Sequence, residues 1–102
     1  MKKLFISQPM KGKTDEEILA ERDKAIQRAK EALHEEVEVI DSFFKDAPAC
    51  NRPLWFLGES LKLLATADVA YFANGWDEAR GCKIEHTCAL EYGIDVIENW
   101  RD

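Results

Sequence analysis

The residue whose type and position most suggest chemistry is Glu85. Residues 78–92 are expected to form a helix, and on a wheel of about 100° per residue Glu85 falls between Tyr92 and Ala89 in the apolar arc. A carboxylate half-buried against a sheet loses hydration, which raises its pKa unless a cation or donors compensate. Because burying a carboxylate in this way is costly, its position suggests that Glu85 has a function. The simpler alternatives are an edge position that reaches water and a pairing with an arginine. The arc also holds Cys82, Ile84, His86, Cys88, Leu90 and Gly93.

Four other features have a candidate role in binding, each with a simpler alternative. Lys11-Gly12-Lys13 precedes a helix and could hold a phosphate, or be a solvated loop. Arg80 is a second phosphate candidate and equally an ion-pair former. Trp76 could stack on a base. Asp41 stands where α/β folds often bind a ribose hydroxyl, although an aspartate that ends a strand is more often a turn former.

The cysteines and histidines do not indicate a metal site. Cys82 and His86 are four residues apart, which is a possible ligand spacing, but structural zinc normally needs a second paired motif and the sequence has none. We therefore predict no metal and no cofactor. Cys50, Cys82 and Cys88 make an odd count without C-x-x-C spacing, which indicates a reducing cytoplasm and not a disulfide framework. Cys82 is expected to be a small buried side chain.

Length and charge exclude several classes of protein. The 102 residues are expected to form one domain spanning 1–102. The net charge is −6 without a basic cluster, so no nucleic acid polymer is expected as a partner. The longest apolar runs are four residues, whereas a membrane span needs about 20, and the apolar stretch after Met1 is too short for a signal peptide. We predict a cytoplasmic protein without a membrane partner.

The elements that must position these residues alternate between strand and helix. Thr14 to Glu17 form a capping box that begins the first helix, Pro53 begins the second, which Gly58 could break, and Gly93 ends the third. Such alternation favours parallel strands and right-handed connections. We predict an α/β, three-layer, Rossmann/flavodoxin-like sandwich with a four- or five-stranded parallel sheet in the order 2-1-3-4. The expected strands are 2–7, 37–40, 68–73 and 94–97, and the expected helices are 14–33, 53–66 and 78–92.

In an open sheet of this order, ligands bind beyond the carboxyl ends of the strands, where the winding reverses. That place lies between strands 2–7 and 68–73. The expected walls are Ser7-Gln8-Pro9-Met10, Asn74-Gly75-Trp76 and the start of the third helix, where Glu85 lies in the early turns.

The segment Gly81-Cys82-Lys83-Ile84-Glu85-His86-Thr87-Cys88-Ala89, followed by Tyr92-Gly93 and a strand, resembles the signature of the nucleoside 2-deoxyribosyltransferase superfamily. Lys3 to Met10 is similar to the family's first strand and substrate loop, and Ala67-Asp68-Val69-Ala70 to the strand before its catalytic helix. The chain looks most like a small phage and bacterial subfamily. The likeness spans nearly the whole chain, and the glutamate segment is its specific part.

The resemblance implies that Glu85 attacks the anomeric carbon of a deoxyribosyl group and forms a glycosyl-enzyme with net retention. Phe5 matches a tyrosine that orients the family's nucleophile. Two positions that often carry acids differ: Ala79 stands six residues before Glu85, and Ser60 eight before Asp68. Asp77, Glu78 and Glu59 lie nearby in the sequence.

We therefore expect transferase or hydrolase chemistry at the N-glycosidic bond of a nucleoside or nucleoside monophosphate, with Glu85 as nucleophile. The alternatives are a non-catalytic nucleotide-binding module of the same fold and a structural subunit. The resemblance also implies a homo-oligomer, in which Asn99 could complete a neighbour's pocket. The expected substrate-binding residues are Phe5, Ser7, Gln8, Met10, Asp41, Asn74, Trp76, Arg80 and Gly81.

Overall fold

A parallel sheet forms the middle layer of the structure, a computed structural model that describes residues 1–42 and 52–99. Within these residues the sheet has four strands in the order β2-β1-β3-β4, and each neighbouring pair is parallel. The predicted fold class and strand order are confirmed. The strands are β1 (Lys2–Ser7), β2 (Val37–Val39), β3 (Val69–Phe72) and β4 (Asp95–Glu98).

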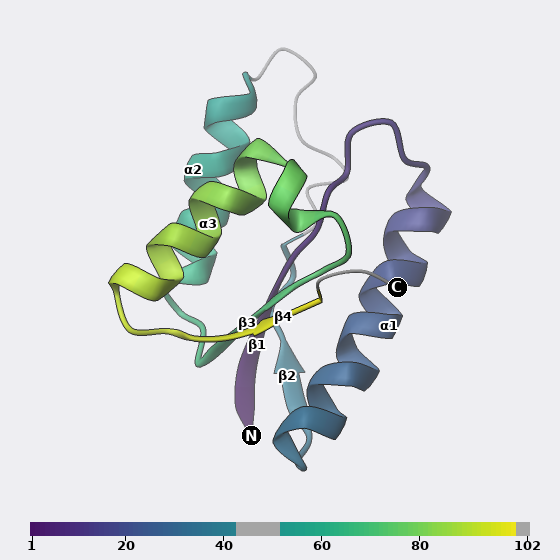
Figure 1. The fold of residues 1–102 in the computed structure, drawn as a ribbon, viewed down its shortest axis with the longest axis vertical. Coiled ribbons are helices and arrows are strands. Elements are labelled where there is room, and N and C mark those ends of the chain that lie inside the picture. Colours follow the sequence, from purple (N-terminus) through teal and green to yellow (C-terminus); the bar gives the residue numbers. More distant parts are fainter. Residues whose placement is uncertain (43–51, 100–102) are drawn as a thin grey trace.

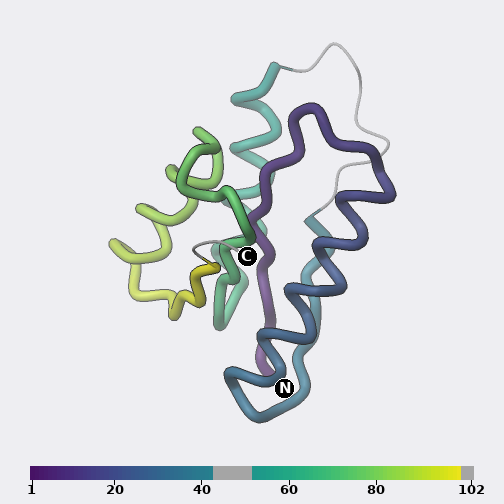
Figure 2. Tube along the Cα trace, turned by 45° about the vertical axis from the view of Figure 1, so that its right-hand side comes forward, coloured from purple at the N-terminus to yellow at the C-terminus, as the bar shows by residue number. Residues whose placement is uncertain are grey.

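The helices cover the two faces of the sheet unequally. They are α1 (Asp15–Leu33), α2 (Pro53–Leu64) and α3 (Arg80–Glu91). Because β2 lies on one side of β1 and β3 on the other, right-handed connections place α1 on one face and both α2 and α3 on the opposite face. Figures 1 and 2 show this separation from two directions. The loops after β1 and β3 therefore leave the sheet next to each other.

Each face has its own apolar core, because alternate residues of a strand point to opposite faces. On the α1 face, Leu4 and Ile6 pack with Ala25 and Ala29. On the α2/α3 face, Phe5 packs with a second set of buried side chains. That set is Leu64, Ala70, Phe72, Trp76, Cys82 and Ala89.

The signals in the sequence that begin and end helices act as expected. The Thr14 side chain accepts from the Glu17 N–H while the Glu17 carboxylate accepts from the Thr14 N–H, and α1 begins there. Gly93 follows α3 with a φ of 74°. The predicted break at Gly58 is wrong, since α2 continues through it. A helical glycine costs only about 1 kcal/mol, and Leu61, Leu63 and Leu64, which follow Gly58, pack α2 onto the core.

The third helix begins later and buries a narrower stripe than the wheel predicted. Trp76–Glu78 form a turn of 3-10 helix (η1), and α3 starts only at Arg80 because Ala79 is extended. Cys82, Glu85 and Ala89 are buried. Ile84, Leu90 and Tyr92 were expected in the apolar arc, but they are exposed by 38%, 56% and 84%. The predicted apolar arc is wrong at these three positions, because α3 packs on its neighbours only along the stripe of Cys82, Glu85 and Ala89.

Two further expectations concern the loop after β2 and the membrane. Residues 43–51, which follow β2 in the sequence and include Cys50, lie outside the described residues. Within the described ranges, none of the helices is long and apolar enough to cross a bilayer.

Candidate active site

Glu85 is held where β1, α2 and α3 meet. Its side chain is only 7% exposed, and its Oε1 accepts a hydrogen bond of 2.6 Å from the Ser7 hydroxyl. Ser60, from α2, also hydrogen-bonds to the carboxylate. Ser7 is the last residue of β1, and it faces α3 because the strand alternation that turns Leu4 and Ile6 toward α1 turns Ser7 the other way. The carboxylate therefore lies at the carboxyl edge of the sheet.

Burial and the two hydroxyls act on this carboxylate in opposite directions. Burial raises the pKa of Glu85, and the hydrogen bonds from Ser7 and Ser60 lower it in part. Within residues 1–42 and 52–99, Glu85 makes no ion pair, so hydroxyl donors and not a cation compensate its charge. Neither simpler alternative from the sequence, an exposed edge or an arginine partner, describes Glu85 in this part of the chain.

Cys82 lies one turn before Glu85 and is not suited to be a nucleophile. Burial, together with the negative charge of Glu85, raises the pKa of the Cys82 thiol to about 11, although a hydrogen bond with Ser7 opposes the shift. The thiolate is the reactive form of cysteine, so this thiol is inert near neutral pH. Cys82 is buried in the core of the α2/α3 face, as the sequence led us to expect.

Gln8 ties β1 to α1. Its Nε2 donates to the Ile18 carbonyl oxygen at 3.0 Å, and its Oε1 accepts from Arg22 Nη1 at 3.3 Å. Both ends of the side chain are therefore engaged on the α1 face, opposite Glu85. Contact between Gln8 and a substrate stays a prediction.

Arg22 is a site feature that the sequence reasoning missed. It is 7% exposed, and besides Gln8 it donates to the Ser42 hydroxyl at 3.2 Å and the Ile40 carbonyl oxygen at 3.1 Å. Burial lowers the pKa of Arg22, and the nearby charge of Asp41 raises it in part. The signal was present, because Arg22 follows Ile18 by four residues and precedes Ala25 by three in the apolar stripe of α1.

Trp76 packs inside the α2/α3 face. Its ring stacks on His86 with centroids 4.2 Å apart and an interplanar angle of 27°. Phe72 meets the same imidazole edge-on, with centroids 4.9 Å apart. The His86 Nε2 in turn pairs with Glu98 Oε2 on β4. A base that stacks on Trp76 would have to use the ring face away from His86, so this role stays a prediction.

The remaining predicted residues lie around the strand ends. Phe5 is fully buried behind Ser7, whereas Asp41, Asn74 and Arg80 are exposed, and Met10 and Gly81 are intermediate. Asn99 follows β4, its N–H donates to the Phe72 carbonyl oxygen, and its buried Nδ2 has no hydrogen-bond partner in the described part of the chain. In that same part, no group of three or more His, Cys, Asp or Glu side chains is placed to hold a metal ion.

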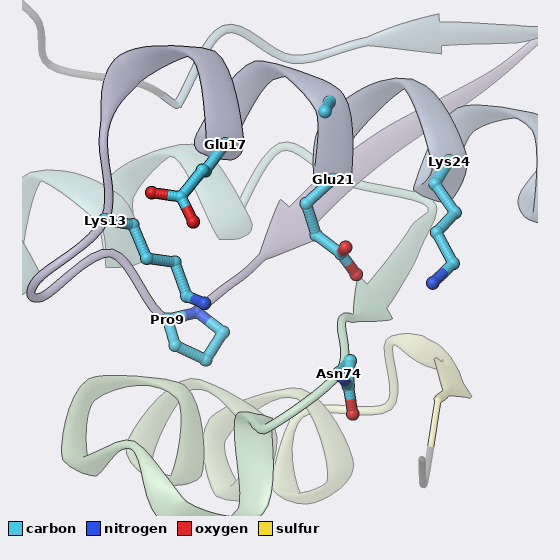
Figure 3. A pocket seen from close by; sticks show the side chains of 7 residues that line it. Pro9, Lys13, Glu17, Glu21, Lys24 and Asn74 are labelled. Carbon is cyan, nitrogen blue, oxygen red and sulfur yellow. The ribbon is translucent and has the colours of Figure 1, made fainter. Parts of the chain in front are cut away.

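A pocket of about 340 Å³ opens between the loops after β1 and β3, where the sequence placed a crevice (Figure 3). Pro9 and Asn74 line it from these loops, as expected. Its other wall is the first half of α1 and not the start of α3. The lining on this side consists of Lys13, just before α1, and of Glu17, Ala20, Glu21 and Lys24 on α1.

The fold and this geometry define an α/β protein with a Rossmann-like parallel sheet and a buried carboxylate at the carboxyl edge. Compared with known proteins, the chain matches no protein-family model, no curated protein and no solved structure. The resemblance carried by residues 81–93 therefore remains a hypothesis about function.

Proposed function

We propose that the protein acts on the N-glycosidic bond of a nucleoside or nucleoside monophosphate, with Glu85 as the nucleophile. The observation that carries the proposal is the carboxylate of Glu85, which is 7% exposed and held by Ser7 at 2.6 Å beside the carboxyl end of β1. Ligands of open parallel sheets bind at this edge. A buried carboxylate with two hydroxyl donors and no ion pair among the described residues is available to face a developing positive charge.

The reaction takes place in two displacements at the anomeric carbon. In the first, a Glu85 oxygen bonds to that carbon while the carbon–nitrogen bond breaks, and the bonding electron pair leaves with the base, which takes up a proton from water. In the second, water or another base attacks the same carbon, loses a proton, and releases Glu85 as a carboxylate. Two inversions give net retention. Water gives hydrolysis, and a second base gives transfer.

Ser7 and Ser60 are positioning residues in this scheme. Their hydrogen bonds fix the carboxylate and favour its ionised form, whereas burial makes it more basic than an ordinary glutamate. Attack requires the ionised form. Activity should therefore rise with pH along a limb that lies above the pKa of an ordinary carboxyl group.

The leaving base receives little help from the positions that often carry acids in the resembled family. Ala79 has no proton to give, and the Ser60 hydroxyl is engaged with Glu85. We therefore expect the best substrates to have bases that leave without protonation. A 7-methylguanine deoxynucleoside, whose base is cationic and departs neutral, should be turned over faster than the deoxyguanosine parent.

The test is release of free base from each deoxynucleoside and its 5′-monophosphate, followed by chromatography. Glu85→Gln keeps the shape of the side chain but removes the nucleophile, and should reduce release to the uncatalysed rate. Glu91→Gln, at an exposed position on the same helix, is the matched control and should leave release unchanged. If Glu85→Gln is as active as the parent chain, the assignment is wrong.

A second candidate is a nucleotide-binding module without catalysis, favoured by Ala79 and by the engagement of Ser60 with Glu85. Calorimetry against the same compounds separates the two. Binding without base release supports the module, and release supports the enzyme. Assembly into a homo-oligomer, with Asn99 reaching a neighbour's site, belongs to the same proposal and is tested by the mass of the protein in solution.

A further inference from the structure

The pocket beside α1 has a charge pattern that the proposed reaction does not use. Four of its lining residues are charged: Lys13, in the turn before α1, and Glu17, Glu21 and Lys24, which share one side of α1. Figure 3 shows the two carboxylates between the two lysines along the helix, with Asn74 across the opening. Two positive and two negative side chains give the described part of the lining no net formal charge.

One polar atom of this lining lacks a partner. The Oε1 atom of Glu21 is buried and accepts no hydrogen bond from any residue in the described ranges. Glu17, by contrast, accepts from the Thr14 N–H in the capping box. A buried acceptor without a donor is unusual in a native protein and calls for an explanation such as a water or a ligand. Glu21 is therefore the place where a bound molecule would present a donor.

The loops after β1 and β3, which form the pocket wall opposite α1, already contact each other. Gly75 has a φ of 86°, and a Cβ atom built there would lie 3.4 Å from Pro9 Cγ. The loops after β1 and β3 thus pack closely on each other. Such contact holds the two loops that carry Pro9 and Asn74 against each other before any ligand arrives, which reduces the entropy lost on binding.

Charge and size together define the ligand. An anion alone would meet Glu17 and Glu21, and a cation alone would meet Lys13 and Lys24, so a molecule with one charge of each sign fits best. The volume of about 340 Å³ is near the lower limit of ligand pockets. Among the residues that the structure describes, its lining contains no aromatic side chain on which a base could stack. We propose that this pocket binds a free α-amino acid, with the ammonium group on Glu21 and the carboxylate on a lysine.

This site is separate from the proposed active site. The pocket wall belongs to α1, whereas Glu85 lies on α3 across the sheet. Assays of base release report on Glu85, and amino-acid binding reports on Glu21. Either proposal can fail without the other.

The test is a titration of the isotopically labelled protein with each of the twenty amino acids at millimolar concentration, followed by amide resonances. We expect at least one to shift the amides of the turn after β1, the first half of α1 and residues 74–75. The N-acetyl derivative of that amino acid and its carboxamide should bind at least tenfold more weakly, because each removes one of the two charges. Glu21→Gln should weaken binding by about tenfold or more, as expected for loss of a charged hydrogen bond. The exposed Glu31→Gln on the same helix should not.

Three results would overturn the proposal. The first is the absence of localised shifts with all twenty amino acids. The second is binding that Glu21→Gln leaves unchanged while its amide spectrum shows an intact fold. The third is a response to inorganic phosphate or to a nucleoside that equals the response to the amino acid, since the site would then not select a zwitterion.

Discussion

Replacement of Ser7 by alanine tests how the buried carboxylate is stabilised. Ser7 is 2% exposed and donates at 2.6 Å to Glu85, which is itself buried. A hydrogen bond to a charged group contributes about 1.5–3 kcal/mol. Ser7→Ala should lower the free energy of unfolding by that amount at neutral pH. For a domain of this size, each kcal/mol corresponds to a change of roughly 4–8 °C in the unfolding midpoint.

The dependence on pH separates this hydrogen bond from simple loss of packing. Without the Ser7 hydroxyl, the pKa of Glu85 rises further, so the cost of Ser7→Ala is largest where Glu85 is ionised and smaller once it is protonated. Urea unfolding of both proteins at neutral and mildly acidic pH measures the difference. Thr87→Ala, which removes an exposed hydroxyl bonded to the Lys83 carbonyl oxygen, is the control and should show no such dependence. A cost for Ser7→Ala that is equal at both pH values would refute the reasoning.

Three further predictions concern buried polar groups. Burial raises the pKa of Glu85, so the stability that this group contributes is present below the pKa of an ordinary carboxyl group and is lost as pH rises through the pKa of folded Glu85. Glu85→Gln should therefore gain stability relative to the parent chain as pH rises, as measured by urea unfolding. A difference in unfolding free energy that stays constant with pH would contradict this. Arg22→Met leaves Gln8 and Ser42 without a donor and should cost about 1–3 kcal/mol in the same assay, whereas no loss would show that the network contributes nothing. Cys82, with a thiol pKa of about 11, should resist a thiol reagent at neutral pH until the protein unfolds, and fast labelling of the folded chain would contradict its burial.

Much of the fold could be predicted because local signals agreed with one another. The capping box at Thr14 begins α1, and Gly93 ends α3. The alternation of strands and helices, together with the handedness of their connections, favoured a doubly wound parallel sheet, of which 2-1-3-4 is a common order. The wheel placed Glu85 in the apolar arc but left an exposed edge position open, and Tyr92 from the same arc is exposed.

The details of the site depend on contacts between distant residues, which no local pattern contains. That Ser7 and Ser60 would both reach Glu85 required the relative placement of β1, α2 and α3. The stacking of Trp76 on His86 depends on the η1 turn after Gly75, which the sequence did not predict, since the expected helix began only at residue 78. Arg22 was overlooked because a long charged side chain at the edge of a stripe usually reaches water.

The most direct test of the central claim is to trap the covalent intermediate on Glu85. A nucleoside with fluorine at the 2′ position of its sugar destabilises a positively charged transition state, and with a good leaving base it should form the glycosyl-enzyme faster than water releases it. Intact-mass and peptide mass spectrometry should then find one fluorosugar per chain, attached at Glu85 and absent from Glu85→Gln. If the adduct lies on another residue, or if no substrate both binds and leaves a sugar on the protein, Glu85 is not the nucleophile.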